Sequence, residues 1–341
     1  MEIAHHAARS SYGRIGRLLA AADPRVEALG ARRLPRRLPR AVAERLIADA
    51  RPEWYREETL AVELALARRV LARRTDLIHL FHGDEQLWWT TRVVRVAGPR
   101  RPRVLATLHQ PPEVLARVGP GRRRLRELDA VIAFCAPQAE ALGELVGGDR
   151  VFTVPHATDT GWWTPGKGVR ADATVLVVGQ WLRDTDVVRG VVARLADRAP
   201  AVRVRLVGAA PELADALRGA ANVTVLGRLE DEALREEYRS ASLLLLALRY
   251  STCNCALLES LACGTPAVVT DVGGVRSYVD ASCAVLTPPA DPETTTEQVL
   301  ELLGDAGRRA TLSRAARERS ARFDQGVVVA CTAEVYAQVA R

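Results

Sequence analysis

The chain has 341 residues, with 48 basic residues against 41 acidic ones, and 48% of its residues are hydrophobic. This composition is ordinary for a globular protein of about two domains, and no apolar run approaches the roughly 18 residues that a membrane-spanning helix requires. The formal net charge of +7 favours an anionic partner, namely a phosphorylated small molecule, a membrane surface or a nucleic acid.

Short apolar runs alternate with runs at helical spacing through the first half of the chain. The apolar repeat over 57–74 predicts a helix, and another helix is expected to begin at Pro137. Buried strands are expected at 76–83, 102–109 and 129–135 and at the start of 151–160. This alternation is typical of a parallel α/β layer.

The second half repeats the pattern after a stretch rich in Gly and Pro, 160–173, which we interpret as a linker. The tail from Pro292 is expected to be helical. Strands are expected at 173–179, 202–208, 222–227, 243–248, 267–270 and 283–288. The sequence therefore predicts two doubly wound domains in series. Ligands of such sheets bind beyond the carboxyl ends of the strands, so two facing sheets would form a cleft.

The six cysteines lack the paired spacings of a disulfide framework, and the first residues lack the apolar core of a secretory signal. We therefore expect a reducing, cytoplasmic compartment. Cys253, Cys255 and Cys263 suggest a metal site at first sight, but no nearby His or second C-x-x-C completes a zinc ligand set. We expect these cysteines to be ordinary packing residues, and we expect neither a metal nor a cofactor.

One acid, Glu259, interrupts the apolar helical run in "CNCALLESLACGTPAVVTDVGGV", residues 253–275. A short helix is expected over roughly 255–263, and its free first amides suit a phosphate or sugar oxygen. A carboxylate one turn inside that helix can accept hydrogen bonds from two adjacent ribose hydroxyls. Gly273 and Gly274 let the backbone approach a ligand closely. The segment predicts a nucleotide pocket without a G-x-G-x-x-G motif or a P-loop.

The same segment resembles the donor signature of retaining GT-B glycosyltransferases of family 4, the glycosyl transferases group 1. That signature is an E-x7-E pattern in an "LEAMACGxPVV" context followed by "GG". Further stretches are similar to family segments in the same order: "LDAVIAFCAPQAEAL", "VFTVPHATDTGWWTP", "TVLVVGQWLRDTD", "NVTVLGRLEDEALREEYRSAS" and "FDQGVVVACTAEVY".

The resemblance implies an α/β protein with the GT-B fold, in which two doubly wound, Rossmann-like domains face a central cleft. Residues 1–160 would form an N-terminal, acceptor-side domain, and residues 161–323 a C-terminal domain that binds the nucleotide-sugar donor. A C-terminal helix at about 324–341 would pack back on the first domain.

The resemblance also implies roles for individual residues. His109, at the end of an N-domain strand, matches the family His that approaches the transferred sugar, and Arg183 is the candidate cation on the diphosphate. These two are the predicted catalytic residues. The predicted donor-binding residues are Glu259 on the ribose, Asn254 and Cys255 facing the donor sugar, Gly227 and Arg228 near the base, Tyr12 and Gly13 beside the phosphates, and Ser251, Gly273 and Gly274.

The chain departs from the family pattern at positions that bear on the donor. Ser251 stands where the first Glu of the pair touches the transferred sugar, and Gln180 stands where an Arg usually follows the strand glycine. The first loop, near Gly13, has a single glycine. The identities of the sugar and of the base are therefore left open.

The expected activity is transfer of a sugar from a nucleotide-diphosphate donor to a small metabolite, a glycan or a lipid, with the anomeric configuration retained. Two alternatives stay open: a non-catalytic nucleotide-sugar-binding protein, and a sugar-nucleotide epimerase on the same fold. No nucleic-acid-binding motif accompanies the charge, so no nucleic-acid partner is expected. The basic N-terminal domain, with arginine runs at 32–40 and 117–126, is a candidate for peripheral contact with the inner membrane surface. The oligomeric state is left open.

Overall fold

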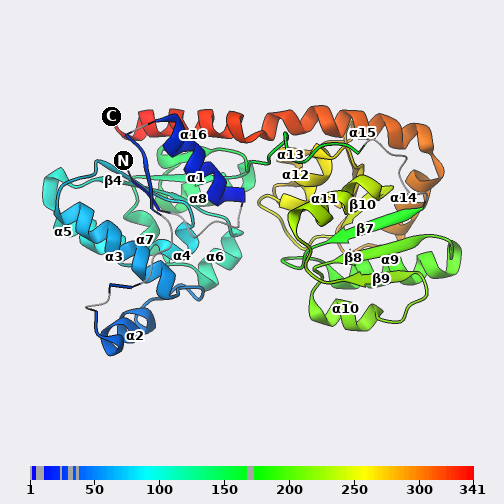
Figure 1. Cartoon of the computed structure of the whole chain (residues 1–341), viewed down its shortest axis with the longest axis horizontal. Coiled ribbons are helices and arrows are strands. Elements are labelled where there is room, and N and C mark those ends of the chain that lie inside the picture. Colours follow the sequence, from blue (N-terminus) through cyan, green and yellow to red (C-terminus); the bar gives the residue numbers. More distant parts are fainter. Residues whose placement is uncertain (1, 5–10, 24, 30–33, 36–37, 167–172) are drawn as a thin grey trace. The chain divides into compact units, whose positions relative to one another are not determined.

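The computed structural model describes residues 2–4, 11–23, 25–29, 34–35, 38–166 and 173–341. The chain divides into two compact units (Figure 1). Unit 1 contains Met1–Ala157 and Gly326–Arg341, and unit 2 contains Thr158–Gln325. Each unit is built on its own six-stranded sheet.

The sheet of unit 1 is parallel throughout, with the order β2-β1-β3-β4-β5-β6. The strands are β1 (Glu2–Ala4), β2 (Glu27–Leu29), β3 (Leu77–Leu80), β4 (Arg103–Thr107), β5 (Ala130–Ala133) and β6 (Val151–Thr153). The order reverses between β1 and β3. The predicted strands near 76–83, 102–109, 129–135 and 151–160 are confirmed, whereas β1 and β2 were not predicted.

Helices connect the strands of unit 1, and the last helix of the chain returns to it. They are α1 (Ser11–Ala22), α2 (Arg40–Ala48), α3 (Glu57–Leu71), α4 (Gly83–Gln86), α5 (Thr90–Val96), α6 (Pro112–Val118), α7 (Arg122–Arg126), α8 (Ala136–Val146) and α16 (Gln325–Val339), with 3₁₀ turns η1 (Gly98–Arg100) and η2 (Gly148–Arg150). The hydroxyl of Tyr336, on α16, hydrogen bonds to Nδ1 of His79 at 2.8 Å, and Nε2 of His79 meets the Thr107 hydroxyl at 2.8 Å. This buried chain of polar groups ties α16 to β3 and β4.

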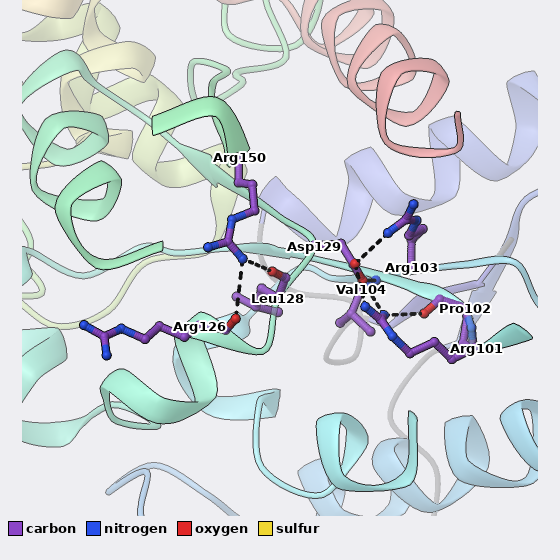
Figure 2. A network of polar contacts seen from close by, with 8 residues as sticks. All are labelled: Arg101, Pro102, Arg103, Val104, Arg126, Leu128, Asp129 and Arg150. Atoms are coloured by element: carbon purple, nitrogen blue, oxygen red, sulfur yellow. Dashed lines mark hydrogen bonds and ion pairs between the residues drawn. The ribbon is translucent and has the colours of Figure 1, made fainter. Parts of the chain in front are cut away.

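At the amino end of this sheet, Asp129 joins the starts of β4 and β5 (Figure 2). Its carboxylate accepts two hydrogen bonds from Arg101, at 2.6 and 2.8 Å, one from Arg103 at 3.1 Å and one from the Val104 N–H at 2.8 Å. Burial opposes ionisation of Asp129, but these donors outweigh it and lower its pKa. Arg150 donates to two backbone carbonyls that precede β5. These arginines therefore hold loops together at the edge opposite the carboxyl ends of the strands.

The sheet of unit 2 is also parallel, with the order β12-β11-β10-β7-β8-β9. Its strands are β7 (Thr174–Val178), β8 (Arg203–Val207), β9 (Val223–Leu226), β10 (Leu243–Leu246), β11 (Ala267–Thr270) and β12 (Val285–Thr287). All six were predicted, and the structure confirms them.

The strand residues of unit 2 alternate between two hydrophobic clusters, because successive side chains of a strand point to opposite faces. Leu244 and Leu246 lie in one cluster, and Leu243 and Leu245 lie in the other. The helices that cover these faces are α9 (Thr185–Arg198), α10 (Pro211–Leu217), α11 (Asp231–Ser240), α12 (Cys255–Ala262), α13 (Val275–Tyr278), α14 (Pro292–Gly304) and α15 (Ala306–Ser320), followed by the 3₁₀ turn η3 (Ala321–Phe323). Strands β7, β10 and β11 are buried at every position, which explains why they are almost continuous apolar runs in the sequence.

Candidate functional site

The strand order of unit 2 reverses between β7 and β10, which makes the carboxyl ends of these two strands a topological switch point. The segments that leave the strands there lie side by side. The Asp184 N–H donates to the Ala247 carbonyl at 3.0 Å, and the Arg249 N–H donates to the Leu182 carbonyl at 2.9 Å. In open α/β sheets, ligands bind in the crevice at such a point.

Helix α12 begins beside this point, and Asn254, a residue type that often caps helices, precedes it. The Asn254 side chain accepts a hydrogen bond from the Leu257 N–H at 3.2 Å. Ser251 is buried and Cys255 is exposed. The first amides of α12 carry the positive end of the helix dipole, so the structure provides the electrostatics expected of this segment.

The two glycines after β11 pack directly against the segment that precedes α12. Gly273 has a positive φ of +53°, and a Cβ added there would overlap the Ser251 carbonyl oxygen and lie 2.9 Å from the Tyr250 ring. The Gly274 N–H donates to the same carbonyl at 2.6 Å. Position 273 therefore requires glycine for both its backbone conformation and its contacts.

Glu259 lies one turn inside α12 and is half-buried. The Tyr238 hydroxyl donates a hydrogen bond to its Oε2 at 3.0 Å. In the part of the chain that the structure describes, Oε1 accepts no hydrogen bond. Burial raises the pKa of Glu259 well above its usual value, the neighbouring Cys255 and Asp231 act in the same direction, and the Tyr238 hydroxyl opposes them.

Arg183 follows β7 and is half-buried at the same edge of the sheet. Its Nε and Nη2 donate to the Val178 carbonyl at 2.9 and 2.8 Å, and its Nη1 donates to the Trp181 carbonyl at 3.1 Å. Burial lowers its pKa to about 10, so the guanidinium remains a cation at neutral pH. The backbone holds this charge at the end of β7, and its contact with a diphosphate stays a prediction.

The remaining predicted residues of unit 2 also follow strands. Gly227 and Arg228 come directly after β9 and are exposed. The carbonyl of Gly227 accepts a hydrogen bond from the Gly208 N–H at 3.3 Å, which joins the ends of β8 and β9. Parallel strands end at a common edge, so the predicted residues after β7, β9, β10 and β11 share the carboxyl edge of one sheet.

In unit 1, His109 follows β4 and is held by Asp84, which lies on α4 after the neighbouring strand β3. One carboxylate oxygen of Asp84 accepts from the His109 N–H at 2.8 Å and lies 3.1 Å from its Nδ1. The other oxygen accepts from the Gln110 N–H at 3.2 Å. His82 stacks on the His109 ring with centroids 4.9 Å apart. Asp84 orients His109, a role that the sequence did not predict for it.

Tyr12 and Gly13 were predicted to lie in a loop beside the phosphates, but they fall in the first turn of α1. The structure does not describe the side chains of these two residues. Among the described residues, no three His, Cys, Asp or Glu side chains gather as potential metal ligands. No helix in the described ranges combines the length and apolar character needed to cross a bilayer.

Two units that each carry a six-stranded parallel sheet, with candidate ligand groups at the carboxyl ends of the strands, have the architecture of the GT-B fold. Solved structures agree with this fold. A sucrose-phosphate synthase from Thermosynechococcus elongatus superposes with a TM-score of 0.73 at 19% identity, over 99% of both chains. Anabaena HepE in complex with UDP gives a TM-score of 0.72 at 17% identity, over 99% of this chain and 100% of that one.

Sequence comparisons identify the family. Residues 172–305 match the model of "Glycosyl transferases group 1". A D-inositol 3-phosphate glycosyltransferase from Geodermatophilus obscurus is 30% identical over 328 residues, which are 87% of this chain and 70% of the relative. Another from Xylanimonas cellulosilytica is 30% identical over 67% of this chain and 62% of its own length. The chain belongs to the group 1 glycosyl transferases and is a glycosyltransferase.

Proposed function

We propose that the chain transfers a sugar from a nucleotide-diphosphate donor, bound at the carboxyl edge of unit 2, to an acceptor, with retention of the anomeric configuration. The observation that carries the donor site is Glu259. Its Oε2 is held by Tyr238, and its Oε1 accepts no hydrogen bond from the described residues. A half-buried carboxylate in that state is suited to accept hydrogen bonds from the vicinal hydroxyls of a ribose.

The other groups at this edge suit the rest of the donor. The amino end of α12 and the Arg183 cation supply positive charge for a diphosphate. The backbone at Asn254 and Cys255 would face the sugar, and Gly227 and Arg228 would lie near the base. Ser251 leaves no carboxylate where the family has one against the transferred sugar, which favours a donor sugar that does not need that contact.

The substrates named for similar proteins support a more specific choice of donor and acceptor. HepE structures in complex with UDP and with UDP-glucose support a uridine-diphosphate sugar as the donor. The D-inositol 3-phosphate glycosyltransferases among the relatives support a phosphorylated polyol as one acceptor class, beside a glycan or a lipid.

In the proposed reaction, the acceptor hydroxyl attacks the anomeric carbon on the face from which the diphosphate departs. The new C–O bond forms as the bond to the phosphate oxygen breaks, and the leaving diphosphate keeps that electron pair and takes the acceptor's proton. No protein nucleophile is needed. The chain supplies charge stabilisation through Arg183 and the amino end of α12. The family resemblance assigns contact with the transferred sugar to His109.

The test begins with a thermal-shift screen of UDP, GDP and ADP and their sugar conjugates. A ligand at 100 times its dissociation constant should stabilise the protein by about 2.7 kcal/mol. The stabilising donor is then incubated with inositol phosphates, glycans and lipids, with and without EDTA. We expect a product with the donor's anomeric configuration, formed equally well in EDTA. Donor binding without release of nucleoside diphosphate across the whole panel would contradict the proposal, as would an inverted product.

A further inference from the structure

Tyr238 is buried in a hydrophobic cluster of unit 2, and its hydroxyl hydrogen bonds to Glu259. The side chain is 0% exposed. Its ring meets Trp163 edge-on with centroids 5.8 Å apart, and its backbone carbonyl accepts a hydrogen bond from the Thr265 hydroxyl at 2.6 Å. The phenol is therefore fixed on α11 from both its ring and its backbone, and its hydroxyl reaches across to α12.

The hydrogen bond from Tyr238 makes the two oxygens of the Glu259 carboxylate different. Oε2 is 3.0 Å from the Tyr238 hydroxyl, whereas Oε1 has no hydrogen-bond donor in the described part of the chain. A glutamate side chain has several rotatable bonds, and ordering such a side chain on binding costs about 0.5–1.5 kcal/mol. A fixed phenol that already holds one oxygen removes part of that cost before the ligand arrives.

The hydrogen bond from Tyr238 also affects the ionisation of Glu259. Burial, Cys255 on α12 and Asp231 on α11 all raise the pKa of Glu259, and the Tyr238 hydroxyl lowers it. Burial and Glu259 together raise the pKa of Tyr238 well above its usual value, and the Arg183 cation after β7 opposes them only in part, so the phenol keeps its proton. Without the phenol hydroxyl, the carboxyl would hold its proton to higher pH and would present fewer acceptor sites to a diol.

We propose that Tyr238 is a positioning residue of the donor site, whose hydroxyl holds Oε2 of Glu259 so that Oε1 is ready to accept the ribose hydroxyls. This inference rests on the proposed function, because it takes the ribose as the ligand of Glu259. It makes the side chain at position 238 a determinant of nucleotide affinity, although it lies behind the carboxylate.

The test compares Tyr238→Phe with the wild type, because phenylalanine keeps the buried ring and removes only the hydroxyl. The probes are UDP, GDP and ADP, each paired with its 2′,3′-dideoxy analogue, and affinity is measured by calorimetry from pH 5.5 to 8.5. We expect Tyr238→Phe to weaken binding of the preferred nucleotide by about tenfold, the scale of a lost hydrogen bond to a charged group. The deficit should grow as the pH falls, and affinity for the dideoxy analogue should not change.

Two further variants separate a positioning role from a packing role. Tyr278→Phe removes a hydroxyl from another buried tyrosine of unit 2 and should bind nucleotide as the wild type does. In a Glu259→Gln background, Tyr238→Phe should have little further effect on affinity, because the two side chains act through one contact.

Unchanged affinity in Tyr238→Phe, or an equal loss for the nucleotide and its dideoxy analogue, would overturn the inference. The proposed function fails separately. It is contradicted if none of the three nucleotides binds the wild type, or if Glu259→Gln keeps the full preference for the ribose hydroxyls. The two proposals can therefore fail independently. If Glu259→Gln loses the preference for the ribose hydroxyls but Tyr238→Phe keeps it, only the positioning role of Tyr238 is rejected.

Discussion

At the scale of single residues, both units place an ionisable side chain at the carboxyl edge of the sheet and support it with a second side chain. Glu259 is supported by Tyr238 in unit 2, and His109 is supported by Asp84 in unit 1. In each pair the supporting residue is almost completely buried. Such support fixes the geometry of the outer group before a ligand binds, which is the physical basis of preorganisation.

Asp84 allows a prediction about His109. If the Nδ1–H of His109 donates to Asp84, the neutral ring carries its lone pair on Nε2. Replacing Asp84 with Asn removes the charge that favours this tautomer. We expect kcat/KM of Asp84→Asn to fall by about 10- to 100-fold, the scale of a charge-assisted hydrogen bond, with nucleotide affinity unchanged. Steady-state kinetics and calorimetry measure the two quantities.

The matched control for that prediction is Asp149→Asn, an exposed aspartate of unit 1. It should leave kcat/KM at the wild-type value. Wild-type kinetics in Asp84→Asn, or a loss of nucleotide affinity equal to the loss of kcat/KM, would show that Asp84 does not act through His109.

At the scale of elements, the loop after β11 depends on glycine at position 273. A side chain there meets the Ser251 carbonyl and the Tyr250 ring, so Gly273→Ala should displace the segment that leads into α12. Gly219→Ala is the control, because Gly219 also has a positive φ, +91°, but has no neighbouring atom within 4 Å. Both variants should lose about 1–2 kcal/mol of stability to the left-handed backbone.

We expect only Gly273→Ala to weaken nucleotide binding as well. Thermal unfolding and calorimetry on the two variants measure stability and affinity side by side. Equal affinity in both variants would mean that the loop at 273 and 274 does not shape the donor site.

The elements also show how far the sequence alone reaches. The strands of unit 2 were predicted because β7, β10 and β11 are nearly continuous apolar runs and β8 and β9 alternate apolar with polar residues. β1 and β2 were missed, since they have three residues each and each contains a glutamate, so they show no strand pattern. Their place in the sheet comes from pairing with one another and with β3, which is tertiary information.

In the candidate site too, some residues could be predicted from the sequence and others could not. Asn254 as a cap and Glu259 as an isolated acid are visible because local pattern and helix chemistry single them out. Tyr238 is the one aromatic residue of a strongly charged helix, which indicates burial and a need for a hydrogen-bond partner. That partner lies 21 positions further along the chain, and no local pattern connects the two.

At the scale of the whole molecule, buried histidines make stability depend on pH. Burial lowers the pKa of His79 to about 3 in the folded chain, against a value near 6.5 when unfolded. Between these two pKa values the unfolded chain binds more protons than the folded chain. The contribution of His79 to the free energy of unfolding is therefore complete above pH 6.5 and is lost as the pH falls. The loss is at most about 1.4 kcal/mol per pH unit.

We therefore expect the free energy of unfolding of the wild type to fall by about 1–2 kcal/mol more than that of His79→Gln when the pH is lowered from 7 to 5. Urea unfolding of both proteins at the two pH values gives the difference. Because α16 meets His79 through Tyr336, the effect should appear in unit 1. Equal losses in the two proteins would contradict a neutral, buried His79.

The most direct test of the donor site is the affinity of Glu259→Ala for the nucleoside diphosphate that the wild type binds, measured by calorimetry. Glu318→Ala, which removes an exposed acid of α15, serves as the control. We expect Glu259→Ala to stay folded and to bind about 1–3 kcal/mol more weakly, whereas the control should bind as the wild type does. An unchanged affinity in folded Glu259→Ala would contradict the assignment of Glu259 to the ribose.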